Sequence, residues 1–252
     1  MKKINFLRPV LNFITIGLLI LTLNRIFLFL TFNERVVETS NYIELFSIGL
    51  RFDLILLCYL SFLPFVLITF LPSHILFKIK KFFNFYFIFF LFLILVMELA
   101  TLDFINQYDT RPNRLFLDYL IYPKEVVGTL LKSYLPSLII TIILSVIALF
   151  FAFKYGKKVF YPIESKYKTK LLLFPFVAFL LFFGARGSLT SKRPINASNA
   201  IFCSDQMTNS LGLNSFYTVA FAAYSMKNEG DVKKYGRMDE LEAYSRVKNT
   251  WM

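Results

Sequence analysis

Residues 103–134 read DFINQYDTRPNRLFLDYLIYPKEVVGTLLKSY, and the placement of the rest of the chain depends on this stretch. It carries charges at both ends, and Pro112 and Pro123 each follow a short polar break. Each proline is expected in the first turn of a helix, where a missing N–H costs little. Apolar residues recur at helical spacing between the breaks, and long apolar runs lie on both sides. The pattern is typical of one or two short helices lying on a bilayer surface, apolar face down. Two interpretations stay open: a ramp leading into the next span, or a platform at the mouth of a lipid-headgroup site.

The composition places the chain among integral membrane proteins. Its 252 residues are 57% hydrophobic and 19% aromatic, with a mean hydropathy of +0.59, and the apolar residues form continuous runs that a soluble domain would not carry. The net charge of +12 does not indicate nucleic-acid binding, because the basic residues cluster in short loops between these runs. The two cysteines, Cys58 and Cys203, are far apart in sequence. We expect neither a disulfide nor a cysteine metal site.

Five apolar runs are long enough to cross the hydrocarbon layer, which takes roughly 20 helical residues. The sequence therefore predicts an all-α polytopic membrane protein with five transmembrane helices. Their expected bounds are about Val10–Phe32, Leu45–Leu71, Phe82–Leu102, Leu135–Phe153 and Leu171–Phe183.

The distribution of lysine and arginine predicts the orientation of these spans. The loops on one side carry twelve such residues: Lys2, Lys3, Arg8, Lys78, Lys80, Lys81, Lys154, Lys157, Lys158, Lys166, Lys168 and Lys170. The two loops on the other side carry five: Arg35, Arg111, Arg114, Lys124 and Lys132. Positive charge favours the cytoplasmic side. We expect the N-terminus in the cytoplasm, and residues 103–134 and the C-terminus outside.

The composition changes after the fifth span, which predicts a boundary at residue 186. Residues 1–186 are expected to form the transmembrane domain, with interfacial helices at about 103–134. Residues 187–252 begin with Ser, Asn and Pro, as in an extended extracytoplasmic linker. A helix is expected from Asn214 or Ser215, both good N-caps, and a second, polar helix from Asp239 to Asn249. This tail would lead to a catalytic domain that the chain does not contain.

Four ionisable residues lie inside predicted spans, where charges are costly and often functional. Arg25 and Asp53 both fall roughly 10–12 Å below the outer interface at 1.5 Å per residue, so an ion pair between neighbouring helices is expected. Arg51 and Glu98 lie nearer the surface. In one interpretation they only extend to the interface. In the other, an outer cavity binds an anionic lipid phosphate.

The candidate headgroup ligands are the cations on the outer side. Arg51 is the strongest of them if Asp53 neutralises Arg25, because a guanidinium matches phosphate geometry. Arg111, Arg114 and Lys124, on the surface segment, are the others.

Several segments together resemble a known family. They are GLRFDL at 49–54, NRLFLDYLIYPKEV at 113–126, RPINASNAIF at 193–202 and LGLNSFYT at 211–218. In this order they are similar to the N-terminal membrane part of the lipoteichoic acid synthase group. These are sulfatase-like phosphoglycerol or phosphoethanolamine transferases of the alkaline phosphatase superfamily. The resemblance covers most of the chain, although no single motif in it is decisive.

The resemblance implies an enzyme of the bacterial cytoplasmic membrane that passes a phospholipid headgroup to an extracytoplasmic polymer or glycan. In this family a threonine nucleophile and a divalent metal such as Mn or Mg lie in a domain after the linker. The chain departs from that pattern, since it ends at Met252 and its sole histidine, His74, is in a cytoplasmic loop. We therefore assign no catalytic residue, no metal ligand and no cofactor to it, and expect it to be inactive alone.

Two functions follow as alternatives. The first is a membrane-anchoring and lipid-donor-positioning domain of a headgroup transferase, whose partners are membrane phospholipid and a truncated or separately encoded catalytic domain. The second is a non-enzymatic membrane protein that binds anionic lipid and regulates a partner. A transporter is disfavoured, because the five spans show no repeat symmetry.

Overall fold

The computed structural model describes residues 5–163, 165–188, 195–229 and 239–250, and within these ranges the regular structure is helical throughout. Five helices are long and apolar enough to cross a membrane, which confirms the predicted all-α fold. They are α1 (Arg8–Thr31, preceded by η1, Asn5–Leu7), α3 (Tyr42–Phe70), α5 (Lys80–Leu99) continued by α6 (Thr101–Tyr108), α9 (Leu135–Phe160) and α10 (Tyr167–Arg186).

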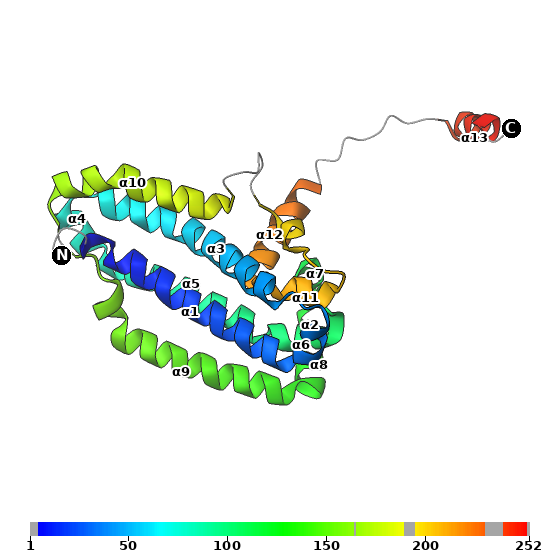
Figure 1. Ribbon diagram of the computed structural model, residues 1–252, viewed down its shortest axis with the longest axis horizontal. Helices are drawn as coiled ribbons and strands as arrows, with labels where there is room; N and C mark the ends of the chain where they lie inside the picture. Colours follow the sequence, from blue (N-terminus) through cyan, green and yellow to red (C-terminus); the bar gives the residue numbers. More distant parts are fainter. Residues whose placement is uncertain (1–4, 164, 189–194, 230–238, 251–252) are drawn as a thin grey trace.

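The long helices run side by side along one axis (Figure 1). Helix α3 packs between α1 and α10, while α9 packs on α5 and α1 at the opposite side of the bundle. Helix α9 is the least enclosed, with 6% of its most apolar window buried against 61% for α3. Exposing so much apolar surface to water would be unfavourable. The exposed apolar face of α9 therefore agrees with a lipid surrounding.

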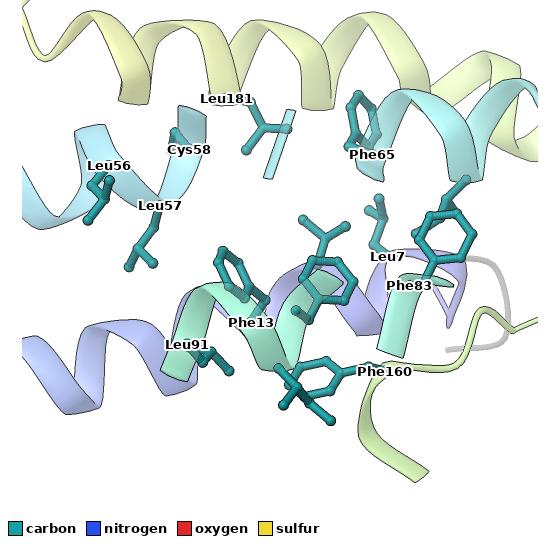
Figure 2. Close-up of a cluster of buried hydrophobic side chains, with 14 of the residues drawn as sticks. Leu7, Phe13, Leu56, Leu57, Cys58, Phe65, Phe83, Leu91, Phe160 and Leu181 are labelled. Carbon is teal, nitrogen blue, oxygen red and sulfur yellow. The ribbon is translucent and has the colours of Figure 1, made fainter. Parts of the chain in front are cut away.

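One end of the bundle is an apolar core of aromatic rings, shown in part in Figure 2. Phe13, Phe65 and Phe83 are fully buried there, and the Phe13 and Phe87 ring centroids lie 5.0 Å apart. We call it the lysine end, because the lysine-rich loops flank it. The buried Lys170 lies at this end, where its Nζ donates a 2.9 Å hydrogen bond to Ile68 O near the last turn of α3.

Short helices connect the spans. They are α2 (Asn33–Glu38), α4 (Ser73–Lys78), α7 (Arg114–Tyr119) and α8 (Pro123–Ser133). Helices α7 and α8 bury no residue, so short helices are present within 103–134, and their position on a bilayer surface stays a prediction. Pro123 begins α8 as predicted. The expectation for Pro112 is wrong, because it precedes α7 and the side chain of Asn113 caps that helix by accepting from Leu115 N at 2.9 Å.

The segment after α10 differs from the expected linker. It forms η2 (Ala197–Ala200), α11 (Gln206–Leu211), α12 (Ser215–Glu229) and α13 (Glu240–Thr250), so both predicted tail helices are present. Met207 and Leu211 are fully buried in a cluster with Leu28 and Leu45. Residues 195–218 therefore pack as part of the bundle, whereas the sequence places a domain boundary at 186. We call this end of the bundle the polar end.

Candidate functional site

The first feature of the polar end is a buried ion pair between α1 and α3. Arg25 Nη1 donates to Asp53 Oδ2 at 2.6 Å and Arg25 Nη2 to Asp53 Oδ1 at 2.9 Å, a bidentate arrangement. The two residues are 1% and 0% exposed. The structure thus brings together the two residues that the depth argument paired. Such a pair is tolerated in a low-dielectric interior only where its remaining polar atoms also find partners.

A second buried pair joins Arg111, in the loop before α7, to Glu98 near the end of α5. Arg111 Nη1 lies 2.7 Å from Glu98 Oε2, and the two residues are 1% and 2% exposed. The expectation that Arg111 is a headgroup ligand on the surface therefore disagrees with its position: its guanidinium is enclosed and neutralised. The interpretation of Glu98 as a residue extending to the interface is wrong for the same reason. The side chain of Asn24, on α1, also donates to Glu98 Oε2.

Both arginines bind the backbone of one short turn, residues 210–215. Arg25 donates to Leu211 O at 3.2 Å and to Leu213 O at 3.3 Å. Arg111 donates to Ser210 O at 3.0 Å. The last carbonyls of a helix lack intrahelical partners, so these contacts satisfy the C-terminal end of α11.

The carboxylates bind the same turn through its donors. Glu98 Oε1 accepts from Ser215 N at 2.8 Å, and Asp53 Oδ1 accepts from Asn214 Nδ2 at 3.1 Å. Both buried pairs are therefore completed by the tail, which explains how four charged groups are accommodated inside the bundle. The helical spans alone would leave these donors and acceptors partly unsatisfied.

The second feature is a pocket of about 270 Å³ between α3 and the end of α10. Its lining residues are Arg51, Leu54, Phe183, Gly184, Gly187 and Ser188. Arg51 Nε donates to the carbonyl oxygen of Gly187, and among the described residues no carboxylate forms an ion pair with Arg51. A guanidinium carries five N–H donors, so a half-buried, positively charged side chain with more donors than the one at Nε lines this pocket.

Two glycines make the close approach of α10 to α3 possible. A Cβ on Gly184 would lie 2.5 Å from Cys58 Sγ, a distance that Cβ atoms in real structures essentially never show. Gly187 ends α10 with a φ of +72°, in the left-handed region that glycine favours. Its carbonyl then faces Arg51, whose positive charge also suits the negative end of the α10 dipole. Helix termination and the cationic pocket are thus built by the same residues.

The remaining two sequence candidates lie elsewhere. Arg114 is exposed on α7, and its Nε is 3.8 Å from Asp118 Oδ2. Lys124 is exposed at the start of α8. Neither lines the pocket at Arg51, so the four predicted headgroup ligands are separated into one pocket residue, one buried residue and two surface residues. Arg114 and Lys124 stay predictions as headgroup contacts.

Sequence reasoning missed Gly187 and Ser188 in the pocket, and Asn214 and Ser215 at the ion pairs. A usable signal existed for Gly187, because a glycine directly after the last apolar run is a common helix stop. For Ser215 the sequence predicts only a helix N-cap. Its contact with Glu98 depends on long-range packing and so has no local signal.

Neither metal ligands among the described residues nor a match to a family model indicates a function. Within the described ranges, no group of three or more His, Cys, Asp or Glu side chains could hold a metal ion. No protein-family model matches the sequence. No solved structure matches the fold at a significant level. The candidate function must therefore be argued from the chain's own residues.

Proposed function

We propose that this chain is the membrane part of a phospholipid headgroup transferase, in which it anchors the enzyme and positions the lipid donor. The headgroup phosphate binds Arg51 at the pocket between α3 and α10, and the acyl chains extend along the exposed apolar faces of the same helices. The C-terminal tail, on the extracytoplasmic side of a bacterial cytoplasmic membrane, carries the catalytic domain.

The observation that carries this proposal is the state of Arg51. Arg25 and Arg111, two fully buried arginines at the polar end, are each neutralised by a buried carboxylate. Arg51 uses Nε for a helix carbonyl and lies at a pocket. Arginine binds phosphate through paired N–H groups in a plane, and these bonds are about twice as strong as neutral ones.

The position of the tail also supports a donor-positioning role. Gly187 and Ser188 line the pocket, and the chain continues from them to residues 195–218, which the two ion pairs fix to the bundle. A domain that follows α12 would therefore be tethered to the end of the bundle that carries the lipid phosphate. Holding two reactants close in a set geometry lowers the entropic part of a reaction barrier.

Lipid binding is the direct test. Purified protein in nanodiscs of phosphatidylcholine is titrated with phosphatidylglycerol, and bound lipid is counted by native mass spectrometry. Replacing Arg51 with Gln should weaken phosphatidylglycerol binding about tenfold, in line with loss of a charge-assisted hydrogen-bond pair. Arg51→Lys, which keeps the charge but loses the fork, should fall between. Arg114→Gln is the matched control, and an equal loss there would show surface charge alone to be responsible.

A second measurement separates the two candidate functions. Because the chain alone is expected to be inactive, native membranes, which also contain any separately encoded catalytic domain, are compared with membranes that lack the chain. Both are supplied with phosphatidylglycerol labelled on an acyl chain, and release of labelled diacylglycerol is followed. The transferase proposal expects turnover that depends on the chain and falls with Arg51→Gln. Binding at Arg51 without any turnover would instead favour the non-enzymatic lipid-binding protein.

A further inference from the structure

A second cavity, unrelated to Arg51, lies near the lysine end between α1, α5 and α9. Its volume is about 280 Å³, and the atoms that line it are almost all apolar. Ile20, Leu91 and Leu95 contribute from α1 and α5, and Ala152 and Tyr155 from α9. The volume lies just below the usual range of ligand pockets, about 300–1,000 Å³. It is of a size for a single hydrocarbon chain and not for a whole lipid.

The cavity exists because α9 places small residues opposite α1 and α5. Ala148, Ala152 and Gly156 recur every four residues on this face of α9. A Cβ on Gly156 would lie 2.6 Å from Asn84 Oδ1, so α9 touches α5 closely at that point. Beyond it the two alanines leave space. Since α9 is largely unenclosed, hydrocarbon from the bilayer is the medium next to this space.

Two lysines close to the lining residue Tyr155, neither of which lines the cavity itself, supply the second half of the argument. Lys154 Nζ lies 5.5 Å from the centre of the Tyr155 ring, which lines the cavity. Lys158 is exposed one helical turn further on, and residues three or four apart on a helix are neighbours, so it too adjoins Tyr155. These ammonium groups lie toward the end of α9, where a span meets lipid headgroups.

We propose that this cavity binds one acyl chain of an anionic phospholipid, with the lipid phosphate at Lys154 and Lys158. The lipid fills the space between α9 and the rest of the bundle and fixes α9 to it. This inference does not rest on the proposed transferase function, because the site is at the opposite end of the bundle from Arg51 and requires no headgroup chemistry.

Fluorescence quenching by brominated lipid tests the proposal. The chain has one tryptophan, so a Trp251→Phe protein gives a dark background. Tyr155→Trp then places a probe at the cavity, and Phe153→Trp places one on a residue that does not line the cavity and is 66% exposed. Each protein is reconstituted in vesicles of phosphatidylglycerol and phosphatidylcholine, with bromine on the acyl chains of one lipid at a time.

The proposal predicts stronger quenching by brominated phosphatidylglycerol than by brominated phosphatidylcholine at position 155, and equal quenching at position 153. Lys154→Gln or Lys158→Gln should each reduce that preference by about fivefold, the effect of one lysine near an anionic lipid. Lys168→Gln, on α10 at the same end, is the matched control and should leave it unchanged. Ala152→Phe, which fills the cavity, should abolish it.

Three results would overturn the proposal. They are no lipid preference at position 155, the same preference at both positions, or a loss with Lys168→Gln as large as with the α9 lysines. If Ala152→Phe fails to fold, the two lysine variants still decide the outcome.

Discussion

The two ends of the helical bundle are held together by different physics. At the lysine end, buried rings such as Phe13 and Phe87 pack between neighbouring spans, and the helices complete this core almost by themselves. At the polar end, Arg25 and Asp53 are buried between α1 and α3, and the turn at 210–215 supplies partners for them. The difference suggests that the spans can assemble first and that the tail completes only one end.

The comparison also bears on function. The end completed by the tail is also the end that carries the Arg51 pocket, so the proposed lipid site and the docked tail lie at the same end of the bundle. The cavity between α1, α5 and α9 adjoins the core of the lysine end, because Ile88, Leu91 and Phe160 belong to that core and also line the cavity.

The largest expected effect comes from breaking the buried pair at the polar end. Asp53→Asn leaves Arg25 as an uncompensated buried charge, and the free energy of unfolding should fall by about 3–5 kcal/mol. Denaturation in mixed detergent–SDS micelles measures it. Asp118→Asn, in the exposed pair with Arg114, is the control and should cost under about 1 kcal/mol. Equal unfolding of the wild type and Asp53→Asn would refute the role of this pair.

A substitution at the lysine end tests whether the two ends are independent. Phe87 is fully buried, and Phe87→Ala should cost about 3 kcal/mol through the cavity that it leaves. The tail should stay docked, so limited proteolysis within residues 195–215 should proceed as in the wild type. Asp53→Asn should accelerate cleavage there. Faster cleavage in Phe87→Ala at native conditions would contradict the separation of the two ends.

A smaller effect is expected from the polar partners in the tail itself. Asn214 accepts from Tyr217 N at 2.9 Å in the first turn of α12 and donates to Asp53. Asn214→Ala should lower the free energy of unfolding by about 1 kcal/mol through loss of the cap. Asn214→Ser retains a capping group and should recover part of that loss. A thermal shift in detergent compares the three proteins, and identical shifts for both substitutions would argue against capping.

The smallest effect is a pH dependence at Asp205. Burial raises the pKa of Asp205, but hydrogen bonds from Thr208 and Arg35 outweigh it and hold the pKa below its ordinary value of 3.8. Ionised Asp205 therefore stabilises the folded protein fully above pH 3.8, and this is lost as the pH falls through the lower, folded-state value. Melting temperatures from pH 6 to pH 3 should fall slightly less in Asp205→Asn than in the wild type. An identical pH profile in both proteins would contradict the assignment.

The parts of the fold that could be predicted depend on local properties of the chain. Span lengths follow from runs of apolar residues, and Arg25 and Asp53 could be paired because a helix fixes depth along its axis. The second pair could not, because Arg111 reaches Glu98 only after the chain reverses beyond α6. Asp109 permits this turn with a φ of 55°, and its side chain is bound by Arg35 of α2.

The tail shows the same limit. Ile195, Met207 and Leu211 are buried. Met207 and Leu211 stand at helical spacing, but α11 has only six residues, so the pattern is too short to recognise and the segment reads as a linker. Its place is set by polar contacts from α1, α3 and α5, which no local pattern encodes. For Arg51 the sequence predicts an outer cavity that binds phosphate as one of two interpretations, but it does not predict which residues line the pocket, since its shape comes from the approach of α10 at Gly184 and Gly187.

The central structural claim is that the turn at 210–215 belongs inside the polar end of the bundle. Hydrogen–deuterium exchange of the Ser215 amide, which donates to Glu98 at 2.8 Å, tests it most directly. We predict exchange as slow as in the spans for the wild type, and faster exchange in Glu98→Ala with the lysine end unchanged. Exchange in the wild type as fast as in an unstructured peptide would contradict the account.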